Sequence, residues 1–423
     1  MTDATNQAIR MALYILKFGG SSVGTIDRIQ HVAGIVKRTR DLGHDVVVVL
    51  SAMQGETDRL ISLAKRLSPH PDPREYDALT VTGEMVSTSL LSIALNEMNV
   101  SARSFNAAQI GIKTTAVHRK ARIAGIDTDL IRATLSSGII PIIAGFQGMN
   151  DQGEFTTLGR GGSDTTAVAL AAALDADECQ IYTDVDGVYT TDPRVTDKAR
   201  KISRITFEEM LEMASLGAKV LQIRAVEFAG KYNVPLRVLS TFDEGQGTLI
   251  TYEDKRMEQP LVSGIALDRN QAKISLFGVP DEPGTASKIF GAISKANIDV
   301  DVIVQNMTTV SNKVDISFTL QRDDYPSAHK LVQKIAKELG ADGVEGDELV
   351  AKLSVVGVGM RSHPGVASTM FRAMSDEGIN MHLISTSEIK ISAIIAEAQV
   401  EQGVISLHQA FGLAEEKIGM VKA

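Results

Sequence analysis

The sequence predicts an α/β protein with a largely parallel sheet, followed by a smaller domain that occurs twice. From Leu13 to about Ser240, short apolar runs alternate with amphipathic or Ala-rich stretches, as expected for parallel strands connected by helices. A charged stretch at 252–260 then predicts a linker, and two copies of one pattern follow it. The length of 423 residues suits about three domains.

Six apolar runs are the candidate strands of the first part. They are 13–18, 46–50, 102–106, 139–144, 180–183 and 236–239. Four of these runs lead directly into small or polar residues, at Lys17, Ser51, Gly145 and Thr183. Because ligands of open α/β sheets bind at the carboxyl ends of the strands, we expect these four segments to face one cleft.

The first of the four is a glycine loop, Lys17-Phe-Gly-Gly-Ser-Ser-Val-Gly24, between a predicted strand and a predicted helix. Such a loop leaves backbone N–H groups free to bind an anion such as phosphate. The lysine precedes the glycines, whereas the Walker motif has its lysine after them, and Gly-x-Gly-x-x-Gly is absent. An ordinary strand-to-helix turn is the alternative for this segment taken alone.

A second glycine loop is Gly159-Arg-Gly-Gly-Ser-Asp164, which opens an Ala-rich helix. Glycines around an arginine at a helix start offer free amides, the positive end of the helix dipole and a cation for bidentate binding of a carboxylate or phosphate. Asp164 alone has the alternative role of a helix cap. Two such loops together favour an anion-binding site.

Three further segments carry residues that suit binding. Glu84 lies in the first turn of a predicted helix, where a carboxylate stabilises the helix dipole or faces a substrate ammonium. The acidic turn 184–193 suits a metal or a ribose, although Asp-Gly turns are common. Lys219 lies near the start of another predicted helix, where a lysine is usually a solvated residue.

Composition and charge exclude several classes. The net charge of −9 argues against a nucleic-acid surface, and the apolar runs are too short to cross a membrane. The single cysteine, Cys179, allows no internal disulfide, and the polar first ten residues do not form a signal peptide, so we expect a cytoplasmic protein. The eight histidines lack metal-ligand spacing, so no protein metal site is expected.

The second half contains the repeat. Residues 272–279 (AKISLFGV) recur as 351–358 (AKLSVVGV), and Pro283-Gly284 recurs as Pro364-Gly365. Each copy predicts a strand, a Pro-Gly turn, a helix, two strands and a final helix. Two copies with a long period indicate a duplicated small domain and not a solenoid.

Six motifs, in order along the chain, resemble those of the aspartate kinase (aspartokinase) family. They are Lys17-Phe-Gly-Gly-Ser-Ser-Val23, Thr82-Gly-Glu84, Gly145-Phe-Gln-Gly148, Gly159-Arg-Gly-Gly-Ser-Asp164, the segment 183–193 and Gly217-Ala-Lys219. The resemblance implies an amino-acid kinase domain, a three-layer α/β/α sandwich, at 12–250 and a linker at 251–261. It implies two ferredoxin-like βαββαβ ACT domains at 262–342 and 343–423.

The resemblance also implies roles for single residues. The catalytic residues would be Lys17, Arg160 and Asp164, and the aspartate-binding residues Ser51, Thr57, Glu84, Phe146, Arg160 and Ser163. ATP would be held by Lys17, Gly19, Gly20, Ser21, Thr183, Asp184, Tyr189 and Lys219. The chain departs from the family pattern at Ser21, where many members have threonine, and at 222–224 (QIR), where many have His-Pro.

The implied activity is ATP-dependent phosphorylation of the side-chain carboxylate of L-aspartate to 4-phospho-L-aspartate, the first step toward lysine, threonine and methionine. A carboxylate is already an anionic nucleophile, so no histidine base is required, and Mg²⁺ would be held mainly by phosphates and water. Lysine, threonine or both would inhibit by binding the ACT domains at Asp281, Asp301, Gln305, Asn380, Ser387 and Glu388. The segment 380–387 resembles the subgroup inhibited by both amino acids.

The sequence leaves the oligomeric assembly and the exact activity open. We expect a homo-oligomer, or a hetero-oligomer with a regulatory subunit made from an internal start near Met257. Whether the ACT modules exchange strands is left open. The rival activities are another carboxylate kinase, acting on glutamate or acetylglutamate, and a non-catalytic amino-acid sensor that keeps the fold.

Overall fold

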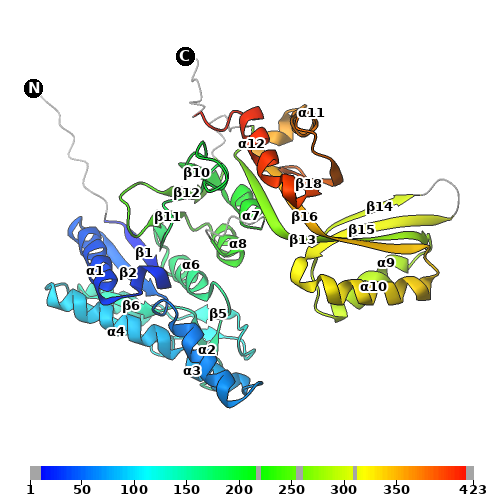
Figure 1. The fold of residues 1–423 in the computed structure, drawn as a ribbon. Helices are drawn as coiled ribbons and strands as arrows, with labels where there is room; N and C mark the ends of the chain where they lie inside the picture. Colours follow the sequence, from blue (N-terminus) through cyan, green and yellow to red (C-terminus); the bar gives the residue numbers. More distant parts are fainter. Residues whose placement is uncertain (1–10, 216–220, 254–260, 308–311, 416–423) are drawn as a thin grey trace, which may run out of the picture. The chain divides into compact units, whose positions relative to one another are not determined.

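The computed structural model describes residues 11–215, 221–253, 261–307 and 312–415, which form two compact units (Figure 1). Lys219 and Met257, singled out from the sequence, lie outside the described residues. Within the described part, the first unit holds 11–188, 201–214 and 221–253. The second unit holds 189–200, 215 and the described residues from 261 onward.

The first unit is built on an eight-stranded sheet with the order β10-β12-β11-β9-β1-β2-β6-β3. Its strands are β1 (Leu13–Phe18), β2 (Asp45–Leu50), β3 (Ala102–Phe105), β6 (Ile140–Ala144), β9 (Glu178–Thr183), β10 (Arg204–Thr206), β11 (Leu236–Ser240) and β12 (Thr248–Thr251). Neighbours are parallel except β11 and β12. All six predicted strands are present, and the largely parallel sheet is confirmed.

Helices cover both faces of this sheet. On one face, α1 (Ile26–Asp41) and α4 (Thr82–Glu97) form a core with β1 and β2 that includes Ile29, Val32, Leu16 and Val48. On the other face, α6 (Gly162–Leu174) contacts β1, β2 and β9, and α8 (Ile223–Lys231) packs on α6. The three-layer α/β/α sandwich is therefore confirmed.

Smaller helices and a second sheet complete the first unit. The helices are α2 (Glu56–Leu67), α3 (Pro73–Thr80), α5 (Asp129–Ser136) and α7 (Phe207–Ser215). A four-stranded sheet has the order β5 (Ile123–Ile126), β4 (Ile112–Thr114), β7 (Gln147–Met149) and β8 (Phe155–Thr157). Helix α3 packs on β8, which brings α3 beside the chain that leads into the second glycine loop.

One helical stretch, Pro73–Glu97, is long and apolar enough to cross a membrane by length and composition alone. Half of its most apolar part is buried in the protein. Its second portion, α4, packs against α1, β3 and β6. These are the contacts of a core helix.

The second unit contains a six-stranded sheet with the order β14-β15-β13-β16-β18-β17. Its strands are β13 (Gly264–Pro280), β14 (Val300–Met307), β15 (Lys313–Gln321), β16 (Gly343–Val356), β17 (Met381–Thr386) and β18 (Lys390–Ala396). Two helices, α9 (Thr285–Lys295) and α10 (Tyr325–Leu339), share one apolar core with β13, β14 and β15. The helices α11 (Val366–Asp376) and α12 (Val400–Ala410) share a second core with β16 and β18.

The internal repeat is a structural repeat. Gly284 and Gly365 each precede the first helix of their copy, with left-handed φ values of +99° and +106°. Glycine adopts this conformation without a steric penalty. A serine pair also recurs, because Ser275 bonds Ser317 at 2.8 Å across β13 and β15, and Ser354 bonds Ser392 at 2.7 Å across β16 and β18.

The two modules share their long strands. The second half of β13 pairs with β15 and with the first half of β16, whereas Gly264–Asp268 pairs with 352–356 at the end of β16. A module built from 343–423 alone has no fourth strand within its described part, and residues 264–268 fill that place. The bounds 262–342 and 343–423 stay a prediction. The pairing of 264–268 with the second copy was not predicted, since pairing between distant segments leaves no local sequence signal.

A stretch from the predicted catalytic span, Tyr189–Arg200, is grouped with the second unit. Thr190 accepts a backbone hydrogen bond from Ile265 N at 2.7 Å. The Thr190 hydroxyl lies 2.9 Å from Nε2 of the buried His408 on α12. Val195 packs on the core of the second module. These contacts hold residues 189–200 against the repeat.

Candidate active site

The centre of the site is an ion pair between Lys17 and Asp164. Lys17 lies in β1 and is 8% exposed, and Asp164 lies in the first turn of α6 and is 7% exposed. Their Nζ and Oδ1 atoms are 2.5 Å apart. Each buried charge therefore has a partner of opposite sign, which a buried charge requires.

A cavity of about 2050 Å³ in the first unit surrounds this pair. Ten of the residues expected at the site line it: Lys17, Gly20, Ser21, Ser51, Thr57, Glu84, Phe146, Arg160, Ser163 and Asp164. They include every residue expected to be catalytic or to bind aspartate. The ends of β1, β2 and β6 thus face one cavity, as predicted for three of the four segments, whereas Thr183 of the fourth does not line it.

Glu84 is a buried acid at this cavity. It is 3% exposed in the first turn of α4, and its Oε1 accepts a hydrogen bond from Ala52 N at 3.2 Å. Its Oε2 has no hydrogen-bond partner among the described residues. Burial raises the pKa of this carboxyl to about 8. A cationic group of a ligand would supply the missing partner and favour the ionised form.

The second glycine loop depends on a close approach of its backbone to α8. Gly161 has a φ of +69°, and a Cβ there would lie 2.0 Å from Cγ of Gln222. Arg224 of α8 donates to the carbonyl of Leu158 at 2.8 Å and to that of Ala121 at 3.2 Å. The residues that replace His-Pro at 222–224 therefore fix the loop that carries Arg160.

Phe146 adopts a strained conformation at the cavity. Its φ is +69°, which is rare for a residue with a side chain. Its N–H donates to the Thr166 hydroxyl at 3.2 Å, and its carbonyl accepts from Leu158 N at 2.9 Å. The surrounding contacts hold this strain, as is common at functional sites.

The first glycine loop forms the short helix η1 (Gly20–Val23). Gly20 and Ser21 line the cavity, whereas Gly19 does not. The Gly19 N–H donates to the Tyr182 carbonyl at 3.3 Å. This amide is therefore already engaged, unlike the free phosphate-binding amide expected from the sequence.

The remaining residues expected to hold ATP are not part of the same cavity lining. Thr183, the last residue of β9, donates to Asp184 Oδ1 at 3.0 Å. Asp186 of the same turn pairs with Lys201 at 2.9 Å. Tyr189 belongs to the second unit, and Lys219 lies outside the described residues. The ATP-binding role of these residues stays a prediction.

The cavity is electropositive although the chain is acidic. Its basic lining residues are Lys17, Lys65, Arg119, Lys120, Arg122, Arg160, Arg224 and Lys231, and its acidic ones are Asp58, Glu84, Asp164 and Glu227. An excess of cations in a cavity attracts anionic ligands. Sequence reasoning missed the segment 118–122 (HRKAR), although its three Lys or Arg residues and one histidine within five positions were a visible signal.

The residues expected to bind an effector occupy several positions in the second unit. Ser387 and Glu388 line a hollow of about 240 Å³ together with His363, Pro364 and Gly365. Asp301 of β14 pairs with the buried Lys352 of β16. The others lie on the surface: Asp281 before α9, Gln305 on β14 and Asn380 before β17.

Comparisons with protein families agree with the two-part architecture. A family model for the amino acid kinase family matches residues 12–240. A model for the ACT domain matches 274–335 and 353–411. The matches cover the three-layer unit and both copies of the repeat.

Named relatives extend over nearly the whole chain. An aspartate kinase of Pseudomonas fluorescens is 60% identical, covering 95% of this chain and 98% of that protein. An aspartokinase of Mycobacterium tuberculosis is 45% identical, covering 98% and 99%. The crystal structure of E. coli aspartokinase III in complex with aspartate and ADP superposes with a TM-score of 0.75 at 29% identity, covering 94% and 99%. By this similarity, the chain belongs to the aspartate kinase family.

Proposed function

We propose that this enzyme transfers the γ-phosphoryl group of ATP to the side-chain carboxylate of L-aspartate and forms 4-phospho-L-aspartate. The observation that carries the proposal is the Lys17–Asp164 pair, which lines an electropositive cavity together with Glu84 and Arg160. We further propose that the product enters lysine, threonine and methionine biosynthesis. The E. coli relative solved with aspartate and ADP supports this choice of ligands.

In the proposed mechanism, the side-chain carboxylate of aspartate attacks the γ-phosphorus. A new O–P bond forms while the bond from the γ-phosphorus to the bridging oxygen of ADP breaks. No proton has to be removed, because the carboxylate is ionised at neutral pH. Lys17 and the amides of the glycine loops offset the negative charge of the two substrates and of the transition state.

Arg160 and Glu84 are the proposed recognition groups for aspartate. A guanidinium binds a carboxylate through two parallel hydrogen bonds, which suits Arg160 for the α-carboxylate. Glu84 would accept from the α-ammonium through the oxygen that has no partner in the described structure. Ser51, Thr57, Phe146 and Ser163, which line the same cavity, would shape the remainder of this subsite.

Mg²⁺ is the proposed cofactor. No group of three or more His, Cys, Asp or Glu side chains in the described part of the chain could hold a metal ion. The phosphates and water would therefore provide most of its ligands, and this donor set suits Mg²⁺. The bound ion would neutralise phosphate charge, in addition to the charge offset by Lys17.

Regulation by lysine, threonine or both is proposed for the repeated modules. The hollow at Ser387 and Glu388 is large enough for a small polar ligand, and it adjoins the Pro-Gly turn that begins α11. A similar solved structure, E. coli aspartokinase III, was crystallised in complex with lysine and aspartate. An inhibitor acts by binding an inactive arrangement better than an active one.

The proposed assembly is an oligomer in the cytoplasm, either of full-length chains or with a regulatory subunit that starts near Met257. The catalytic span 12–250 and the linker 251–261 remain the proposed division of the chain. Untagged expression tests the internal start. A second, smaller band containing the repeat supports it, and a single full-length band contradicts it.

The activity is tested by trapping the acyl phosphate with hydroxylamine. ATP is supplied with L-aspartate, L-glutamate or N-acetyl-L-glutamate, with and without lysine and threonine. Hydroxamate formed from aspartate alone supports the proposal, and a decrease with lysine and threonine supports the regulation. Product from glutamate alone would indicate another carboxylate kinase, and no product would indicate a sensor.

A further inference from the structure

Asp77 is a buried carboxylate whose hydrogen bonds connect two segments that line the catalytic cavity. It lies on α3 and is 0% exposed. Its Oδ1 accepts from the Thr157 hydroxyl at 2.8 Å, and its Oδ2 accepts from Thr157 N at 3.1 Å. Oδ2 also accepts from Arg119 N at 2.9 Å and from Nδ1 of His118 at 3.0 Å. One carboxylate therefore joins α3, β8 and the segment 118–122.

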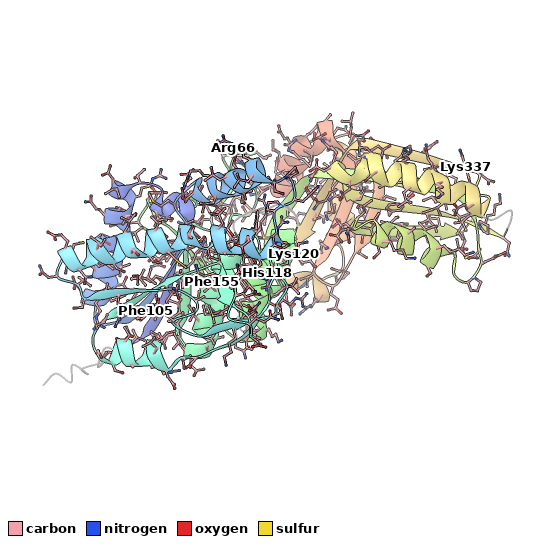
Figure 2. The ribbon with its side chains drawn as sticks, turned by 90° about the horizontal axis from the view of Figure 1, so that it is seen from below. Arg66, Phe105, His118, Lys120, Phe155 and Lys337 are labelled. Carbon is pink, nitrogen blue, oxygen red and sulfur yellow. The ribbon has the colours of Figure 1, made fainter. Side chains whose placement is uncertain are left out.

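Both segments that bond Asp77, the end of β8 and residues 118–122, line the cavity. Thr157 ends β8, and Leu158 and the loop with Arg160 follow it directly. The segment 118–122 lines the cavity through His118, Arg119, Lys120 and Arg122, and Figure 2 labels His118 and Lys120 on it.

The segment 118–122 requires support from its neighbours. Arg119 has a left-handed φ of +67°, which an arginine adopts only when surrounding contacts impose it. Its guanidinium lies 4.5 Å from the centre of the Tyr76 ring on α3. Ala121 N donates to the Thr157 carbonyl at 2.9 Å. A Cβ at Gly159 would lie 3.2 Å from the Arg119 carbonyl, so the segment also packs against the second glycine loop.

Asp77 is also close in the chain to the acid of the cavity. Helix α3 ends at Thr80, and α4 starts at Thr82 with Glu84 in its first turn. The carbonyl of Asp77 accepts from Val81 N at 3.1 Å, at the junction of these two helices. The residue therefore connects the element that carries Glu84 with the loop that carries Arg160.

We propose that Asp77 is a positioning residue for the aspartate subsite, which keeps Glu84, Arg160 and the segment 118–122 at the correct separation. This inference rests on the proposed function. Asp77 does not line the cavity. It acts through Thr157, His118 and Arg119 and not by contact with the substrate.

The test is the variant Asp77→Asn in the full chain. An amide keeps the shape of the side chain but removes its negative charge. Its oxygen at the Oδ2 position would accept only weaker, neutral hydrogen bonds from Thr157 N, Arg119 N and His118, and its NH₂ group at that position would face these donors. We expect the KM for aspartate to rise at least tenfold, while the KM for ATP and the kcat at saturating aspartate stay within about threefold. A folded Asp77→Asn enzyme with an unchanged KM for aspartate overturns the proposal, as does an equal rise for both substrates.

Two further variants make the test decisive. Glu209→Gln is the matched control, because Glu209 is also a buried carboxylate, accepts two hydrogen bonds from Thr206 and does not line the cavity. We expect it to leave the KM for aspartate unchanged.

If Asp77→Asn does not fold, Thr157→Val provides a second test. It removes one hydrogen bond to Asp77 and should raise only the KM for aspartate, by about threefold. An unchanged value there overturns the proposal. Lack of aspartate turnover in the wild type would instead contradict the proposed function.

Discussion

The Nζ of Lys17 lies 2.5 Å from Oδ1 of Asp164, although the two residues belong to distant parts of the chain. The parallel order of β1 and β9 and the packing of α6 on β1 bring them together. Both side chains are nearly buried, so neither charge is stable there without the other. The pair can therefore form only when the sheet and α6 are assembled as in the folded protein.

Arg160→Lys should raise the KM for aspartate about tenfold or more and leave the KM for ATP within about threefold. Lysine keeps the positive charge but cannot form the two parallel hydrogen bonds of a guanidinium to a carboxylate. Steady-state kinetics with each substrate varied in turn provide the measurement. An unchanged KM for aspartate would remove Arg160 from the aspartate subsite.

Glu84→Gln should change how stability depends on pH. The folded-state pKa of Glu84 is raised from 4.5 to about 8. The folded state therefore keeps a proton that the unfolded state loses above pH 4.5. Relative to the glutamine variant, the wild type should lose stability as the pH rises from 4.5 to 8, and be least affected below 4.5. Urea unfolding of both proteins at pH 5 and pH 8 measures this, and a difference that does not vary with pH would contradict it.

Gly161→Ala should destabilise the protein and also raise the KM for aspartate. The added Cβ would clash with the Gln222 side chain, and the left-handed backbone at this position disfavours any side chain. Together these effects should lower the free energy of unfolding by about 2 kcal/mol or more. Gly153→Ala is the control, because Gly153 has a φ of +76° but nothing within 4 Å of the new Cβ. The control should lose about 1 kcal/mol and keep its kinetics. Equal effects in both variants would show that the contact with Gln222 is unimportant.

Glu388→Gln should weaken feedback inhibition severalfold without changing the kcat measured without effector. Glu388 lines the hollow of the second module and is exposed there. Glu401→Gln is the control, since Glu401 is an exposed acid on α12 that pairs with Arg269 outside the hollow. Inhibition curves for lysine and threonine give the comparison. Identical curves for both variants and the wild type would place the effector elsewhere.

Several features could be predicted because they depend on short, continuous sequence patterns. The strands that end at Lys17, Ser51 and Gly145 are apolar runs followed by small or polar residues, and parallel topology places such ends together. The repeat was visible because the turns at Gly284 and Gly365 need a left-handed residue in both copies.

Other features depend on contacts between distant segments and had no local signal. Residues 264–268 serve as a strand of the second module because β13 and β16 extend through both modules. The segment that contains Tyr189 belongs to the second unit, although it lies within the predicted catalytic span, because residues such as Thr190 contact the repeat. Asp77 resembles an ordinary helix residue in the sequence, and its role emerges only from partners such as Thr157.

The most direct test of the account is ATP-dependent hydroxamate formation on L-aspartate by the full chain and by Lys17→Met. We expect product from the wild type and at least a hundredfold lower kcat from the variant, because an electrostatic group at the reacting phosphoryl group is lost. Circular dichroism should first show that the variant is folded. Equal rates for the two proteins would contradict the role of Lys17, and wild-type product from glutamate but not aspartate would contradict the proposed reaction.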